Sequence, residues 1–187
     1  GSITKTDRAG VFEGDRLVGA IETTYSHGHD ESGNTFSGEG TNTYKVINGD
    51  LRLIQSHEVT TYHSKPLYDS RTGTWKENNQ KTVVTKDTYY QYNDKGKLTG
   101  AYGTSYSATT DIINGQSVLL SETRSEIKFA IVNGRAVVSQ VHDITTAYGT
   151  FYWDEFSGSL QFQRDTSTTV TESWVRYTYS AGGYVTG

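Results

Sequence analysis

Hydrophobic and polar residues alternate along most of this chain, with a period of two. Segments of about 12 to 22 residues, rich in Thr, Val, Ile and Tyr, carry this alternation. No segment shows a sustained helical period of 3.6 residues, and none has helix caps around an apolar stripe. The pattern therefore predicts an all-β chain.

Short turn signals separate these segments. Asn-Gly and Asp-x-x-Gly between alternating segments favour tight hairpins, because such turns need residues at positive φ. The turn signals lie at 12–15, 30–34, 47–49, 69–73, 93–96, 113–115, 132–134, 155–158 and 181–183. They predict eight strands, each antiparallel to its neighbour, near 16–27, 34–47, 50–68, 74–93, 97–113, 116–132, 135–154 and 159–180.

The pattern occurs twice. Residues 46–61 (VINGDLRLIQSHEVTT) and residues 131–146 (IVNGRAVVSQVHDITT) agree at six positions when one is shifted by 85. The stretch LVGAIETTYS at 17–26 likewise matches LTGAYGTSYS at 98–107 with a shift of 81. We therefore expect a single domain over residues 1–187, built by tandem duplication of a four-strand unit at about 12–93 and 94–180.

The two units must cover each other, because a four-strand sheet can seldom bury its apolar face alone. The favoured arrangement is an up-and-down meander that forms a closed or flattened barrel, which has no free edges. The alternative is an open, elongated meander, single-layered or sandwich-like, whose edges pair with further repeats.

The strand after each Asn-Gly turn contains a glutamine, a histidine and an acid. Strand alternation predicts that Gln55 and His57 lie on the apolar face and that Glu58 lies on the opposite, wet face. The neighbouring histidine and acid are therefore poor catalytic dyads.

In a closed barrel of eight strands, the third and seventh strands lie opposite each other. Gln55, His57, Gln140 and His142 would then face one interior. Two interpretations follow: a lumen site for a small polar ligand or a metal, or a buried polar layer that serves packing.

A second candidate site is the stretch SHGHDESGN at 26–34. His27, His29, Asp30 and Glu31 offer nitrogen and oxygen ligands for a metal within five residues. The alternative is a solvated hairpin tip, because loops gain charges freely.

Aromatic residues concentrate at the ends of the predicted strands: Tyr89, Tyr90, Tyr92, Phe151, Tyr152, Trp153, Trp174, Tyr177 and Tyr179. If exposed, such rings can stack against sugars or anchor a protein partner. Alternatively, they replace missing aliphatic residues in a thin core and form cross-strand pairs.

Charge and composition narrow the function. The net charge is −4 and the basic residues form no stripe along the chain, so nucleic acid is not an expected partner. There is no run of about 20 apolar residues, and the charges of Arg52 and Glu58 on the wet face argue against membrane insertion. The chain lacks cysteine and shows no nucleophile elbow, phosphate loop or metalloprotease motif, so we expect neither an enzyme nor a cofactor.

The segment YYQYNDKGKLTG at 89–100 resembles the YD or RHS repeat of large bacterial surface and toxin-shell proteins. The resemblance rests on Tyr90, Tyr92, Asp94, Gly96 and Leu98, and FYWDEFSGSL at 151–160 fits it loosely. It implies a secreted scaffold of stacked β-hairpins without chemistry of its own.

We expect a non-enzymatic extracellular structural or adhesive β module, a repeat of a bacterial or phage surface, fibre or adhesin protein. It would be secreted or held at the cell surface, with neighbouring repeats, other copies, or a surface glycan or protein as partners. The alternatives are a ligand-binding barrel of the calycin type and a carbohydrate-binding module that uses the aromatic strand ends.

Overall fold

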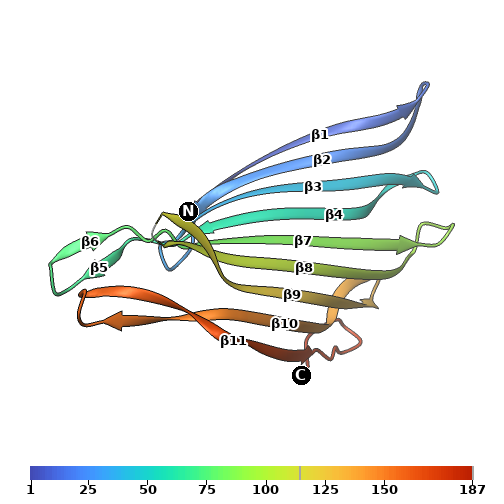
Figure 1. Cartoon of the computed structure of the whole chain (residues 1–187). Helices are drawn as coiled ribbons and strands as arrows, with labels where there is room; N and C mark the ends of the chain where they lie inside the picture. The colour runs from blue at the N-terminus through green and yellow to red at the C-terminus, as the bar shows by residue number, and fades with distance from the viewer. Residues whose placement is uncertain (114, 187) are drawn as a thin grey trace.

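The computed structural model describes residues 1–113 and 115–186, except for the side chains of residues 150–153, 159–160 and 165–168. Within these residues the chain forms one long meander of strands and no helix (Figure 1). The strands are β1 (Ser2–Glu13), β2 (Arg16–His29), β3 (Thr35–Ile47), β4 (Asp50–His63), β5 (Leu67–Asp69), β6 (Thr74–Lys76), β7 (Lys81–Tyr92), β8 (Leu98–Ile113), β9 (Gln116–Val132), β10 (Arg135–Asp154) and β11 (Ser159–Arg176).

Nine of these strands form one sheet in the order β1-β2-β3-β4-β7-β8-β9-β10-β11, and β5 pairs only with β6. Every neighbouring pair is antiparallel. The prediction of an all-β, up-and-down antiparallel meander is thus confirmed, and the turn signals locate β2, β3, β8, β9 and β10 to within two residues.

Two parts of the strand prediction are wrong. The predicted strands 50–68 and 74–93 are shorter, because β4 ends at His63 and β7 begins at Lys81, with the β5–β6 hairpin between them. Pro66, the only proline, follows β4 and cannot donate to a strand ladder. The sequence prediction also missed β1, an edge strand exposed at every position that shows no apolar face.

The sheet is open. β1 and β11 are its two edges and do not pair with each other in the described part of the chain. The closed barrel that we favoured is therefore not found, and the strands follow the alternative, an open single-layer meander. The accessible surface of 12477 Å² exceeds the roughly 8,900 Å² expected for a compact monomer of 20.7 kDa.

The barrel prediction assumed an apolar face that must be covered, and neither face is apolar. Cross-strand partners lie on the same face of a sheet. One face, here called the histidine face, carries all five histidines and a row formed by Asp7, Thr23, Thr41, His57, Asp87, Thr104, Glu126, His142 and Trp174. The other, the threonine face, carries a row formed by Thr4, Ser26, Gly38, Thr60, Val84, Ser107, Thr123, Thr145 and Thr171.

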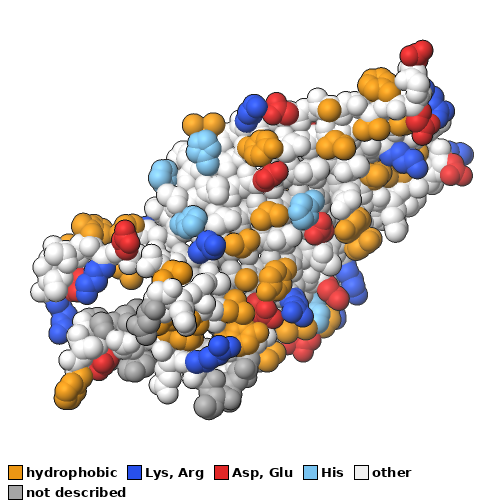
Figure 2. All heavy atoms as spheres, turned by 45° about the horizontal axis from the view of Figure 1, so that its top comes forward, with side chains coloured by type: hydrophobic (Ala, Val, Ile, Leu, Met, Phe, Trp, Pro, Cys, Tyr) orange, Lys and Arg blue, Asp and Glu red, His pale blue; other side chains and the backbone are white. Residues whose placement is uncertain are grey.

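The side chains on the threonine face are small, and side chains from adjacent strands on the same face cover some of them. Three of the most buried residues described, Ala20, Thr60 and Thr88, lie on this face, at 2%, 8% and 6% exposure. On the opposite, histidine face, whose pale-blue histidines are in view in Figure 2, hydrophobic side chains occur in small groups between polar ones. Faces of this kind can stay in contact with water, so no second layer is required to cover them.

β-bulges change which face a side chain occupies. Ile54 is left unpaired on β4, so Leu53 pairs with Tyr44 while Gln55 pairs with Thr43. Leu53 and Gln55 therefore lie on opposite faces, and the predicted face that combined leucines with Gln55 and His57 is wrong. An extra residue in one strand reverses the alternation of every residue beyond it.

The bulges recur with the spacing of the sequence match. Ser139 on β10 is unpaired like Ile54, 85 residues earlier, and Thr99 on β8 is unpaired like Val18 on β2, 81 residues earlier. The turn residues Asn48 and Asn133 also share a positive φ, of 52° and 50°. The local geometry of the two halves thus agrees where their sequences agree.

The β5–β6 hairpin leads to a prediction about pH. Lys76 Nζ lies 2.7 Å from Asp69 Oδ2, and the hydrogen bond from Lys76, helped by the backbone N–H of Arg71, lowers the pKa of Asp69 from 3.8 to about 2. A carboxyl group with a depressed folded-state pKa stabilises the fold above its unfolded pKa and loses that contribution as pH falls. We expect the hairpin to open between about pH 4 and pH 2.

The ring of Trp75, whose centroid lies 5.2 Å from that of Tyr68 across the hairpin, reports this opening. Its indole resonance should move towards the random-coil position over that pH range. In the control Asp69→Asn, the resonance should already lie closer to that position at pH 7 and change little. An unshifted Trp75 resonance in the unmodified protein down to pH 2 would contradict the assignment.

Candidate functional site

The histidine face brings a titratable pair together between β4 and β7. His57 Nδ1 lies 2.8 Å from Asp87 Oδ1, and the two residues are direct cross-strand partners. Their side chains are 43% and 25% exposed, so the pair lies at the solvent boundary. The pair therefore fixes the register of β4 against β7 more than it creates an isolated reactive centre.

A second pair lies at the other side of the sheet, between β10 and β11. His142 Nε2 lies 2.6 Å from Glu172 Oε1, and the imidazole stacks on the indole of Trp174 with ring centroids 3.6 Å apart and planes inclined by 7°. The His142 side chain is only 14% exposed, while Glu172 is 56% exposed. The indole and the carboxylate together hold the imidazole in one orientation.

The two glutamines do not join the histidines in one site. Gln55 Nε2 donates to Tyr89 Oη at 3.4 Å, and the Tyr89 ring stacks on Tyr102 at 4.9 Å. Gln140 has Lys128 and Arg176 as its cross-strand partners. The predicted set thus belongs to two neighbouring rows of one exposed face.

His57 and His142 also lie too far apart to share a ligand atom. Three strands separate β4 from β10, so the two histidines are four strand spacings, about 19 Å, apart along the sheet. The open strand order does not bring these residues to one interior, so the lumen site, which requires the strands to face each other across a barrel, stays a prediction.

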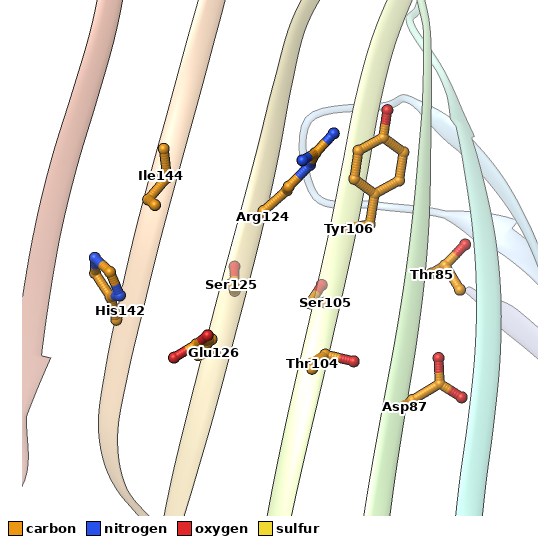
Figure 3. A pocket seen from close by; sticks show the side chains of 10 residues that line it. All are labelled: Thr85, Asp87, Thr104, Ser105, Tyr106, Arg124, Ser125, Glu126, His142 and Ile144. Atoms are coloured by element: carbon orange, nitrogen blue, oxygen red, sulfur yellow. The ribbon is translucent and has the colours of Figure 1, made fainter.

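Between the two pairs the histidine face is hollowed into an open trough of about 450 Å³. It runs over β7, β8, β9 and β10 and is lined by Thr85, Asp87, Thr104, Ser105, Tyr106, Arg124, Ser125, Glu126, His142 and Ile144 (Figure 3). Asp87 and Glu126 give it carboxylates, and Arg124 and His142 give it nitrogen donors. The arrangement can offer hydrogen bonds to a polar ligand, but it does not enclose one.

Contacts around Tyr106 set the polarity of one end of the trough. The Tyr106 hydroxyl donates to Glu122 Oε2 at 2.9 Å, and this hydrogen bond raises the pKa of Tyr106. Arg124 lies over the same ring, 5.9 Å from its centroid, and its guanidinium is 3.3 Å from Glu122. Tyr106 therefore serves as a neutral hydrogen-bond donor and a ring surface.

The predicted metal loop is only partly a loop. His27 and His29 belong to β2, where they face Ser37 and Thr35 of β3. Asp30 accepts hydrogen bonds from the backbone N–H and the side-chain amide of Asn34, at 2.9 and 2.8 Å, and these bonds lower the pKa of Asp30. Among the described residues no group of three or more His, Asp or Glu side chains is arranged to hold a metal ion. The metal site at His27, His29, Asp30 and Glu31 stays a prediction.

The aromatic residues divide into covered and exposed rings. Burial raises the pKa of Tyr90 and of Tyr92, which lie at the turn end of β7. Trp174 and Tyr177 are 53% and 37% exposed. The side chains predicted at Phe151, Tyr152 and Trp153 lie outside the described residues.

Comparisons with protein-family models, with curated proteins and with solved structures find no match for this chain. The described residues contain no helix that is long and apolar enough to cross a membrane.

Sequence reasoning missed the partners of both histidines. Asp87 and Glu172 are far from His57 and His142 in sequence, and only the strand pairing brings them together. The stacking of Trp174 on His142 was missed for the same reason. A signal was present: the shift of 85 relates Asp87 to Glu172, so both copies carry an acid 30 residues after the histidine, although Asp87 lies directly opposite His57 while Trp174 lies opposite His142.

The stack of His142 on Trp174 gives a quantitative prediction. Stacked aromatic pairs contribute about 0.5–1.5 kcal/mol beyond their buried area. In a double-mutant cycle of His142→Ala and Trp174→Ala, measured by urea unfolding, we expect a coupling energy in this range.

A matched cycle on His57 and Trp174, which lie on the same face but do not touch, serves as the control and should give a coupling near zero. A coupling near zero for His142 and Trp174 as well would show that the stack does not hold the last strand in place.

Proposed function

We propose that this chain is a non-enzymatic structural and adhesive β module, a repeat of a bacterial or phage surface, fibre or adhesin protein. The observation that carries the proposal is the open single-layer sheet, whose two faces and two edges are all available to neighbours. A module of this kind binds its partners through exposed faces and edges, because a single layer encloses little space for a ligand.

The polar contacts on the sheet support a structural role. The pairs His57–Asp87 and His142–Glu172 each join adjacent strands, as do the hydroxyl pairs Thr82–Thr109 and Thr123–Thr145, both 2.9 Å apart. Such cross-strand contacts stabilise and register a sheet. His57 and His142, which the sequence offered as candidates for a binding site, thus contribute to the pairing of adjacent strands.

Secretion or display at the cell surface fits the thiol-free, Thr- and Tyr-rich composition. Neighbouring repeats or other copies are the proposed partners, in keeping with the resemblance of residues 89–100 to YD or RHS repeats. The other candidate architecture, a closed calycin-type barrel with a ligand in its lumen, requires that β1 meet β11, and the open strand order does not favour it.

A second candidate, glycan binding, is favoured by the exposed rings on the histidine face. Tyr102, Tyr106 and Trp174 are 49%, 39% and 53% exposed and lie in or beside the trough, next to the carboxylates of Asp87 and Glu126. Ring faces beside hydrogen-bonding carboxylates are suited to a sugar, with its apolar C–H face and its hydroxyl edge. This would supply the adhesive part of the proposed role.

Small-angle X-ray scattering tests the structural proposal directly. A compact chain of 187 residues has a radius of gyration of about 16 Å. Strands of this length in a nine-stranded single layer give about 18–20 Å. We expect the larger value for the monomer, without added ligand or metal. A radius near 16 Å would instead indicate closure into a compact barrel and would contradict the proposal.

A glycan array tests the adhesive part. We expect binding of the unmodified protein to a subset of neutral or basic glycans, with at least a tenfold loss in Tyr106→Ala, because that ring lines the trough. The matched control is Tyr62→Ala, which removes a similarly exposed ring from the threonine face and should leave binding unchanged. Equal binding by both variants, or none by the unmodified protein, would remove the glycan candidate.

A further inference from the structure

We propose that the open edge of β11 is a docking site for one kind of strand: a strand of the β8 type, supplied by a further repeat unit of the same design. This inference rests on the proposed function as a repeat module and specifies which neighbour covers which edge, and in which register.

The turn after β11 reproduces the turn between β7 and β8. In the first, Gly183 has a φ of 83° and its N–H donates to Ser180 O at 2.9 Å; in the second, Gly96 has a φ of 74° and its N–H donates to Asn93 O at 2.9 Å. The backbone bonds that close the two turns, Ser180 N to Tyr184 O and Asn93 N to Lys97 O, measure 2.9 and 3.0 Å. Both turns thus have the geometry of a hairpin that returns the chain along the preceding strand.

The side chains at these turns play matching parts. Ser180 Oγ accepts from the backbone N–H of Tyr184 at 3.2 Å, as Asn93 Oδ1 accepts from that of Lys97 at 2.9 Å. Each turn is also held from the adjacent Asn-Gly hairpin. Asn133 Nδ2 donates to Ala181 O at 3.0 Å, while Asn48 Nδ2 donates to Lys95 O at 3.4 Å.

Beyond the turn, pairing has already begun with the residues that directly follow β11. Tyr179 forms an antiparallel bridge with Val185, and Thr186 N donates to Thr178 O at 2.8 Å. The equivalent first pair of the β7–β8 hairpin is Tyr92 with Leu98. The sequences agree at the same places, since Val-Thr-Gly at 185–187 corresponds to Leu-Thr-Gly at 98–100, with a shift of 87.

The edge of β11 is suited to being covered. Val170, Trp174 and Val175 are 61%, 53% and 43% exposed along it. A long edge strand with large exposed apolar side chains readily accepts another strand, and proteins that leave an edge free usually break it with charges or proline. Between Thr169 and Val175 the only charged residue is Glu172, which is already engaged by His142.

β1 is not the strand that this edge fits. Asp7 of β1 lies opposite Thr23, as Asp87 of β7 lies opposite Thr104, and Thr23 and Thr104 are equivalent in the two copies. β1 therefore corresponds to β7, and hence to β11. A second copy that joined through its β1 would place two strands of one type side by side, whereas a β8-type strand continues the order found inside the sheet.

The test extends the full chain by a third unit. Because Gly187 corresponds to Gly100, residues 101–187 are repeated directly after Gly187, which sets the new strand in the register that β8 has on β7. The control carries one extra glycine at the junction, which shifts the register by one residue and turns every side chain to the other face.

Hydrogen exchange of the β11 amides is the measurement. Between Thr169 and Val175, alternate amides point to the open edge and the others to β10. We expect the edge amides to exchange at least tenfold more slowly in the extended chain than in the original one, and the β10-facing amides to change little. The control with the extra glycine should not show this slowing.

The proposal is overturned if the added unit folds, with its own strands protected, while the β11 edge amides exchange as before. If the added unit does not fold, a peptide of residues 97–113 is added in trans to the original protein. Chemical-shift changes along β11 would then support the proposal, and their absence would overturn it. Scattering from the unextended chain tests the module function separately, so a failure of the edge-docking proposal can be told from a failure of the proposed function.

Discussion

The hydrogen-bonded pairing of adjacent antiparallel strands in a single layer is the interaction on which the rest of this structure depends. No second layer covers either face, and the described residues show only Ala20 and Leu120 as buried hydrophobic side chains. Stability must therefore come from the continuous backbone ladders and from the side-chain pairs between neighbouring strands. This constraint explains why Thr, Ser and Gly recur on the threonine face and why charged and aromatic pairs join neighbouring strands on both faces.

The same constraint determines where function can reside. A single layer has two faces and two edges but little enclosed volume, so recognition has to use an exposed surface. The trough on the histidine face is shallow because its walls are the side chains of β7 to β10 alone. The edges differ from the faces, because their unpaired N–H and C=O groups can form hydrogen bonds with another strand. A repeat module is the role in which all of these surfaces are used at once.

Much of the sheet could be predicted from the sequence, because turns and alternation are local signals. The Asn-Gly turns at Asn48 and Asn133 place the ends of four strands, and β9 and β10 begin and end where alternation predicts. Whether the sheet closes could not be predicted, since closure depends on whether β1 meets β11, which no local pattern encodes. The prediction of which side chains share a face failed at Ile54, where one unpaired residue reverses the alternation. The partners of His57 and His142 depend on pairing between strands that the sequence separates by 30 residues.

The distance between the two edge strands tests the central claim most directly. The chain has no cysteine, so spin labels can be attached at Thr4→Cys on β1 and Thr171→Cys on β11 without removing native thiols. These positions lie in one row of the threonine face, eight strand spacings, about 38 Å, apart along the sheet. For an open sheet, even a curved one, we expect pulsed electron–electron double resonance to give a single distance above about 25 Å between the two spin labels. A distance below about 15 Å, as expected for neighbouring strands, would mean that the sheet closes and would contradict this account.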